Sequence, residues 1–263
     1  MAKKYKTGLV LSGGGTRGFA HLGVISALNE NGIQPDIISG ASVGSIVGAF
    51  IASGKSPEEI FSIFKKDRLF KYTKLQLPVD GLLRLDGLKE IILNEIPVKN
   101  IEDLKIPFFV SVSNLNKGIA EYKNSGPLAE TVLASSSIPA LFSPVKINGD
   151  LYVDGGLMDN IPTEPIKDMC DYLIISNISP VNPTDRLKNL IQITYRTFYM
   201  SVNAYKKEIN KANTIFIEPE GIDKYEILST SHAQELYDLG YQSTIKVLKD
   251  NESGTILNTI KLF

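Results

Sequence analysis

One stretch constrains this chain more than any other, residues 37–45 with the sequence Ile-Ile-Ser-Gly-Ala-Ser-Val-Gly-Ser. A short apolar run ends in Gly-x-Ser-x-Gly, and an apolar segment of helical character follows at residues 46–52. This order is typical of a nucleophile elbow, in which a strand turns sharply into a helix and presents one serine hydroxyl. Glycine is expected at Gly40 and Gly44 because side chains there would collide as strand and helix approach each other. Ser42 is therefore a candidate nucleophile; alternatively it only caps the helix, and the pentapeptide alone does not choose between these interpretations.

The overall composition predicts an ordinary globular chain. The 263 residues, 43% hydrophobic and 22% charged, suit one α/β domain spanning residues 1–263. A formal net charge of −1 disfavours a nucleic-acid partner. The longest apolar run is too short to cross a bilayer, and the basic N-terminus is not followed by the apolar core of a signal peptide. The single cysteine, Cys170, excludes an internal disulfide and is expected to be a packing residue, so we predict a cytoplasmic protein.

The order of predicted elements indicates a mainly parallel sheet with helices on its faces. Residues 7–12 are expected to form a buried strand and residues 19–31 a helix, before the strand that leads into the elbow. A strand–helix–strand–helix order of this kind is the start of a parallel α/β sheet. Further strands are predicted at residues 106–114, 171–179 and 214–218, and further helices at 58–66, 81–94, 128–134, 187–212 and 231–249.

The glycine loop between the first strand and its helix has two competing interpretations. Gly13, Gly15 and Gly18 satisfy Gly-x-Gly-x-x-Gly, the fingerprint of a dinucleotide-binding domain. That fingerprint also needs an acidic residue at the end of the second strand, whereas Asp36 comes before that strand. Alternatively, the consecutive glycines present backbone N–H groups to a developing oxyanion beside Ser42. The glycines fit both interpretations, but the serine elbow fits only the second.

A second informative stretch offers a base for the serine. Asn148-Gly149, flanked by alternating residues, predicts a two-residue hairpin whose returning strand ends at Asp154. Such an aspartate can also simply bond its own turn. His21 is expected to pack inside the first helix and His232 to lie on the surface, so a Ser-His-Asp triad is disfavoured. The simpler hypothesis is a dyad in which Asp154 accepts the Ser42 proton directly, with burial raising its basicity.

The segment Lys65–Lys74 interleaves five basic residues with leucine, phenylalanine and tyrosine. It could be a flap that touches an anionic lipid surface. The alternative is a solvated helix end and loop.

Three motifs in order resemble the signatures of the patatin-like phospholipases. They are the Gly-Gly-Gly-Thr-Arg-Gly loop at residues 13–18, the elbow at 40–44 and Asp-Gly-Gly at 154–156. The resemblance covers about residues 7–180 and extends to the Ser-Ser-Ile-Pro-Ala-Leu-Phe stretch before the hairpin. It implies a three-layer α/β/α sandwich and a compact bacterial type of acylhydrolase that cleaves fatty-acyl esters of lipids.

The resemblance also assigns roles to particular residues. It implies that Ser42 is the nucleophile and Asp154 the base. The N–H groups around Gly13, Gly14 and Gly15 would form the oxyanion hole, with Arg17 holding the loop or adding positive potential.

The sequence suggests neither a metal site nor another cofactor, because its acidic residues are scattered without ligand spacing. Two alternatives remain open: a nucleotide-binding Rossmann-like domain, and a patatin-fold regulatory adaptor without activity. The expected partner is a lipid or acyl-ester substrate, with transient membrane contact through Lys65–Lys74.

Overall fold

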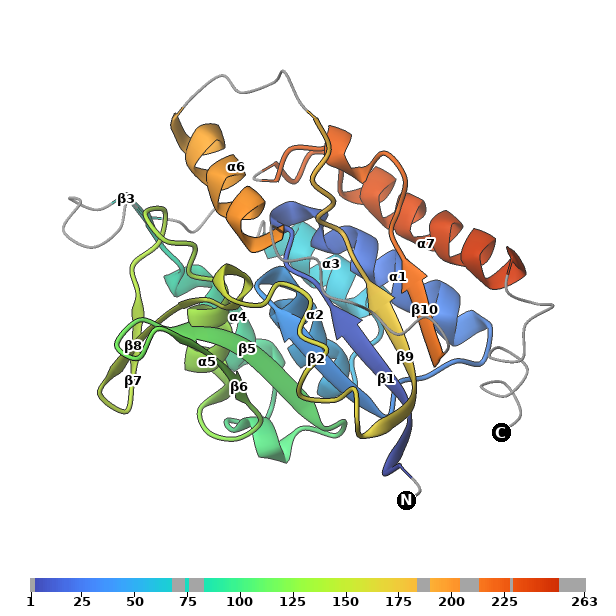
Figure 1. Cartoon of the computed structure of the whole chain (residues 1–263), viewed down its shortest axis with the longest axis horizontal. Helices are drawn as coiled ribbons and strands as arrows, with labels where there is room; N and C mark the ends of the chain where they lie inside the picture. The colour runs from blue at the N-terminus through green and yellow to red at the C-terminus, as the bar shows by residue number, and fades with distance from the viewer. Residues whose placement is uncertain are drawn as a thin grey trace.

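The structure is a computed structural model that describes residues 3–67, 74–75, 83–183, 190–203, 213–227 and 229–250. Within these residues an eight-stranded sheet runs through the middle of the molecule (Figure 1). Its strands lie in the order β10-β9-β1-β2-β5-β8-β7, and β6 pairs with β5 beside this path. The strands are β1 (Tyr5–Leu11), β2 (Ile37–Ala41), β5 (Phe108–Asn114), β6 (Ile119–Lys123), β7 (Val145–Ile147), β8 (Asp150–Asp154), β9 (Cys170–Ser176) and β10 (Thr214–Ile217), with a separate pair β3 (Lys74–Leu75) and β4 (Leu83–Arg84).

The sheet is mixed, and its parallel part is the larger. Strands β10, β9, β1, β2 and β5 are parallel to one another, whereas β6 and β8 are antiparallel to β5. The hairpin β7–β8 turns at Asn148 and Gly149, which have φ of 51° and 97°. Positive φ at both central residues is what a tight two-residue hairpin turn requires, so this prediction is confirmed.

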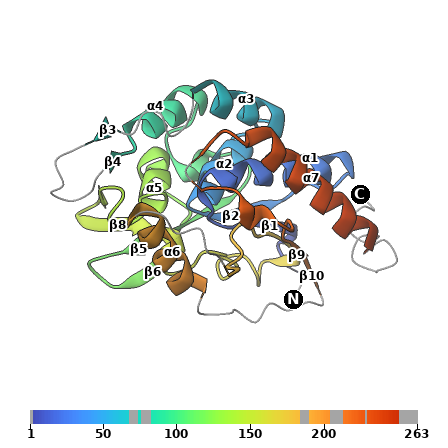
Figure 2. The ribbon, with the colours of Figure 1, turned by 90° about the horizontal axis from the view of Figure 1, so that it is seen from above.

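Helices cover one face of the sheet and form the larger core. Side chains alternate along β1, so that Leu9 and Leu11 join the helical core while Val10 joins a smaller cluster on the opposite face. That opposite face is covered by the connection after β8, through Ile166, and α6 lies on this side in Figure 2. The helices are α1 (Phe19–Glu30), α2 (Val43–Ala52), α3 (Pro57–Asp67), α4 (Asp86–Glu95), α5 (Leu128–Ser135), α6 (Leu190–Asn203) and α7 (Ala233–Asp250). The predicted three-layer α/β/α sandwich is confirmed, with one layer built largely from a connection.

Strand β5 brings β2 and β8 together. Residues 110–111 of β5 pair with both β2 and β6, so these two strands lie on opposite edges of β5. Residues 112–114 pair with β6 and β8, which places β8 on the same edge as β2. Ala41, the last residue of β2, lies opposite Ser111, and Asp154, the last residue of β8, lies opposite the next residue. Two strands running in opposite directions therefore end against each other.

Strand β6 is a strand of the main sheet that the sequence patterns did not predict, and the short pair β3 and β4 was not predicted either. The side chains of β6 are exposed or only half-buried, so it lacks the apolar run that marks the inner strands. Helix α4 also begins at Asp86, later than the predicted residue 81, because β4 precedes it. None of the helices in the described part of the chain is long and apolar enough to cross a bilayer.

Candidate active site

Ser42 lies between the end of β2 and the start of α2, with φ 52° and ψ −127°. An L-residue held in this sparsely populated region costs on the order of 1–3 kcal/mol, which the surrounding contacts must offset. Its backbone N–H donates to Ser135 Oγ at 3.0 Å, and its carbonyl accepts from Ser45 N at 2.8 Å. Ser42 is 6% exposed, so the strand-to-helix turn holds it under cover rather than at an open tip.

The two glycines of the elbow are positions of close backbone approach, as predicted. A Cβ atom on Gly40 would lie 2.5 Å from the Gly44 carbonyl oxygen. A Cβ atom on Gly44 would lie 2.2 Å from the Leu11 carbonyl oxygen, at the end of β1. The turn from β2 into α2 can therefore close only when position 40 lacks a side chain, and α2 can pack against β1 only when position 44 lacks one.

Asp154 ends β8 and is 1% exposed. Its Oδ1 accepts a hydrogen bond from Gly156 N at 2.7 Å, whereas Oδ2 is buried and has no hydrogen-bond partner among the described residues. Burial raises the pKa of Asp154 to about 7, and the Ser42 hydroxyl and the Gly156 N–H group both oppose that rise. The Ser42 hydroxyl thus lies near enough to favour the charged carboxylate, although its geometry falls outside that of a standard hydrogen bond.

Two buried serines form hydrogen bonds with the backbones of Ser42 and Asp154, and the sequence patterns did not identify these serines. Ser135 Oγ, which accepts from Ser42 N, donates to the Ser111 carbonyl at 2.7 Å. Ser113 Oγ donates to the Asp154 carbonyl at 2.8 Å. The signals were present as Ser-Val-Ser on β5 and the serine run at the end of α5, but their roles depend on strand pairing.

The glycine bend lies directly against Ser42. A Cβ atom on Gly13 would lie 3.0 Å from Ser42 Cβ. The Gly13 N–H group already donates to Asn160, to Oδ1 at 3.1 Å and to the carbonyl oxygen at 3.3 Å. The N–H groups of Gly14 and Gly15 have no such bond within the described ranges. Asn160, which sequence reasoning missed, lies in the connection after Asp154 and also donates through Nδ2 to Ser179 Oγ at 2.7 Å, so it links the bend to the segment that follows β9.

Arg17 holds the loop rather than pointing at the serine. Its guanidinium donates from Nε and Nη2 to the Tyr225 carbonyl, at 3.1 and 2.9 Å, and from Nη2 to the Asp223 carbonyl at 3.2 Å. Of the two roles that the resemblance offered, these contacts support the first.

Neither histidine belongs to the site. His21 is fully buried, with Nδ1 2.7 Å from Ser176 Oγ and Nε2 2.9 Å from the Ser12 carbonyl. His232 lies on the surface, with Nδ1 2.9 Å from Glu235 Oε1. Both positions agree with the packing and surface roles predicted from the sequence. Cys170 is likewise buried, and burial raises the pKa of its thiol to about 12.

Burial of His21 leads to a first prediction, that the protein loses stability between about pH 6.5 and pH 4. Desolvation lowers the pKa of His21 to about 4. Between this value and about pH 6.5 the unfolded chain binds a proton at His21, whereas the folded chain does not. The stabilising contribution is complete above the unfolded pKa and is lost as the pH falls through the folded one. Urea unfolding across this range should show a steeper fall for the natural chain than for His21→Gln, which cannot titrate. Equal slopes for the two proteins would contradict the prediction.

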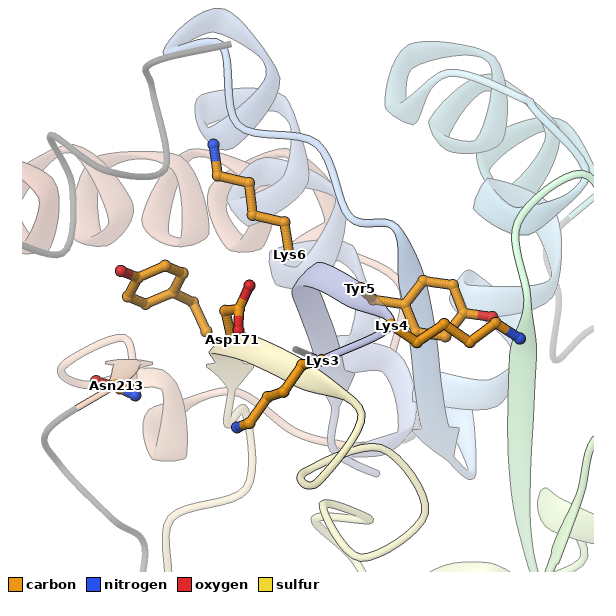
Figure 3. Close-up of a pocket in the computed structure, with 7 residues that line it drawn as sticks. Lys3, Lys4, Tyr5, Lys6, Asp171 and Asn213 are labelled. Carbon is orange, nitrogen blue, oxygen red and sulfur yellow. The ribbon is translucent and has the colours of Figure 1, made fainter. Parts of the chain in front are cut away.

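A hollow of about 520 Å³ lies where the parallel strands begin, at the end of the sheet opposite to Ser42 (Figure 3). Its walls come from the beginnings of β1 and β9, including Lys6 and Asp171, and from Asn213 before β10. Ser42 follows the end of a parallel strand, and this hollow surrounds the beginnings of such strands. The hollow is therefore separate from the site around Ser42.

The predicted flap Lys65–Lys74 lies mostly outside the described residues. Lys65 is described, and its Nζ lies 5.8 Å from the centre of the Phe61 ring. The proposed lipid contact of the segment stays a prediction.

Comparison with known proteins places this chain in a family of phospholipases. Residues 9–167 match the family described as patatin-like phospholipase. The chain belongs to the patatin-like phospholipase family, which confirms the resemblance found in its three motifs.

Two curated relatives and one solved structure show the extent of the similarity. The chain is 29% identical to lysophospholipase NTE1 of Kluyveromyces lactis and 29% identical to that of Saccharomyces cerevisiae, and each alignment covers 89% of this chain. It spans only 18% and 16% of those proteins. The crystal structure of VipD from Legionella pneumophila superposes with a TM-score of 0.56 over 95% of this chain and 67% of that one, at 17% identity, which supports the fold.

Proposed function

We propose that this chain is a serine acylhydrolase that cleaves fatty-acyl esters of lipids through Ser42 and Asp154. The observation that carries the proposal is the meeting of β2 and β8 at consecutive residues of β5, which places a strained serine beside a buried carboxylate. Family membership and the names of the lysophospholipase relatives support the reaction class. A phospholipid or lysophospholipid is accordingly the proposed substrate.

The residues act in two half-reactions. Ser42 Oγ attacks the ester carbonyl carbon while Asp154 takes the hydroxyl proton, and the carbonyl oxygen becomes an oxyanion. Backbone N–H groups of the glycine bend stabilise that charge, and those of Gly14 and Gly15 make no other hydrogen bond within the part of the chain that the structure describes. The carbon–oxygen bond to the alcohol then breaks, and Asp154 returns the proton to the departing oxygen. Water repeats the sequence on the acyl-enzyme and releases the fatty acid.

The environment of Asp154 suits a base that works without histidine. An ordinary aspartate is too weak a base to accept a serine proton efficiently near neutral pH. Burial raises its pKa to about 7, and Oδ2, which has no hydrogen-bond partner among the described residues, can accept the proton. The base therefore becomes stronger while remaining charged in a large fraction of molecules near neutral pH.

The test is covalent labelling by a fluorophosphonate, which reacts with an activated serine. We expect one adduct per chain at Ser42 and none in Ser42→Ala, with both proteins equally folded by circular dichroism. The labelling rate should rise with pH through about 7 and then level off, because the reaction needs the Asp154 carboxylate. Labelling of Ser42→Ala at the natural rate would overturn the proposal.

The same experiment separates the other interpretations. A regulatory adaptor with this fold, or a nucleotide-binding domain, would show no labelling at Ser42. The engagement of Gly13 N–H by Asn160 and the serine at the end of β2 already favour the hydrolase over nucleotide binding.

A further inference from the structure

Helix α6 places a tyrosine over the nucleophile. Tyr199 is 7% exposed, whereas the next residue, Met200, is 53% exposed and Ile193 is 46% exposed. The helix therefore turns its Tyr199 side inward, and it packs against the short 3₁₀ turn Gly155–Leu157 that follows Asp154. Figure 1 shows α6 crossing near this end of the sheet.

Tyr199 belongs to a small apolar cluster that is separate from the main core. The cluster also contains Ile138, Leu141 and Phe142, with Ile227 packed against it. One side reaches the glycine bend, because the Ile227 carbonyl accepts from Thr16 N at 2.8 Å. The segment 138–142 follows Ser137, whose carbonyl accepts from Asp154 N at 2.9 Å, so the other side reaches the base. The cluster is therefore connected to both the glycine bend and the strand end that carries Asp154.

The tyrosine hydroxyl lies close to the glycine bend and to the Ser42 side chain. A Cβ atom placed on Gly13 would lie 3.5 Å from Tyr199 Oη and 3.0 Å from Ser42 Cβ. Asn160 Oδ1 lies 2.5 Å from the same point, so the amide oxygen, the serine side chain and the hydroxyl gather around it. Tyr199 Oη and Ser42 Cβ can be no further apart than the sum of their two distances. An ester carbonyl attacked by Ser42 occupies this region, between the bend and the serine.

The glycine bend alone offers fewer donors than its three glycines suggest. Gly13 N–H makes two contacts with Asn160, and Asn160 is itself held by Ser179. Reaching the oxyanion with Gly13 would mean breaking bonds inside a buried network, which is costly. An additional donor beside Gly13 would replace the one that Asn160 has taken.

We propose that Tyr199 is a further catalytic residue, whose hydroxyl donates a hydrogen bond to the ester carbonyl oxygen as it becomes an oxyanion. This inference rests on the proposed acylhydrolase function. In the step concerned, the bond from Ser42 Oγ to the carbonyl carbon forms, the π pair moves onto oxygen, and the serine proton moves to Asp154. Tyr199 keeps its own proton throughout and shares it only as a hydrogen bond.

The experiment compares Tyr199→Phe with the natural chain on a p-nitrophenyl ester. Loss of a donor that acts mainly in the transition state should lower kcat by about 100-fold and leave KM nearly unchanged. Tyr241→Phe is the matched control, because it removes the same atom from α7, where the hydroxyl donates to Glu30 Oε2 at 2.6 Å on the surface. The control should keep its full kcat.

A second measurement distinguishes oxyanion binding from a structural role. A trifluoromethyl ketone adds to Ser42 and forms an oxyanion, whereas the corresponding alcohol binds without one. The ratio of the two affinities should fall about 100-fold in Tyr199→Phe. Because both compounds sample the same folded protein, partial unfolding cancels in this ratio.

The outcomes separate the inference from the function on which it rests. Unchanged kcat and an unchanged affinity ratio in Tyr199→Phe, with Ser42→Ala inactive, would overturn the role of Tyr199 alone. Full activity of Ser42→Ala would instead overturn the hydrolase mechanism. A raised KM with an unchanged affinity ratio would show that Tyr199 only shapes the pocket, and would also overturn the inference.

Discussion

Asp154→Asn is expected to lose turnover by about 10²- to 10⁴-fold, the contribution typical of a general base, and yet to fold more stably above neutral pH. Asparagine keeps the Oδ1 acceptor for the Gly156 N–H group, which lies 2.7 Å away in the natural chain. It has no carboxylate with which to take the Ser42 proton. The loss should therefore appear in kcat and in the rate of fluorophosphonate labelling alike.

The expected gain in stability follows from the raised pKa. Between the ordinary aspartate pKa and about 7, the folded chain holds a proton that the unfolded chain releases, so the free energy of unfolding falls as the pH rises. Above about pH 7 the folded chain carries a buried charge, which the amide of asparagine avoids. The gain should be several kcal/mol at about pH 8 and should fall to less than half of that at about pH 5, where the folded chain keeps the proton but the unfolded chain still releases it.

Urea unfolding of the natural chain and of Asp154→Asn at these two pH values measures the effect. Asp150→Asn is the matched control on the same strand, because Asp150 is only half-buried and Lys117 lowers its pKa through a contact of 2.8 Å. That control should show no gain at the higher pH. A destabilised Asp154→Asn at both pH values would mean that the carboxylate serves the fold rather than the reaction.

Gly44→Ala is expected to abolish the elbow and with it most of the stability of the protein. Alanine is ordinarily favoured over glycine inside a helix by about 1 kcal/mol. At this position the added carbon would lie 2.2 Å from the Leu11 carbonyl and 2.6 Å from that of Ser12. Both atoms belong to the backbone of β1 and the glycine bend, so strand and helix must separate, and the loss should reach several kcal/mol.

Urea unfolding and labelling at Ser42 measure this loss together. Ser45→Ala, one residue further along the same helix, loses only the hydroxyl bond to the Ser42 carbonyl at 2.7 Å, which is worth about 1 kcal/mol. It should remain folded and labelled. A Gly44→Ala protein with natural stability and natural labelling would show that the close approach is not needed.

Local patterns determined the elements that carry the site. The Gly-x-Ser-x-Gly elbow follows from residues adjacent in sequence, since the small residues at 40 and 44 decide whether strand and helix can touch. The Asn148-Gly149 hairpin is local for the same reason, because it depends on two residues that tolerate positive φ. These predictions needed no knowledge of distant contacts.

The sequence did not predict the groups that reach the site from distant parts of the chain. Asn160 lies far from Gly13 along the chain, and Tyr199 lies further still, so nothing in their surroundings marks them as parts of a glycine bend. Ser113 and Ser135 are similar cases, because a serine on a strand or helix has no assigned partner until the strands pair.

What the sequence by itself determined is therefore the class of fold, the serine turn and the aspartate turn. Only the tertiary structure decided that these turns meet, because β8 runs antiparallel to β5 on the edge that β2 occupies and ends where β2 ends. The same meeting buries Asp154 and so sets its pKa, since desolvation depends on what surrounds the carboxylate rather than on its neighbours in the chain.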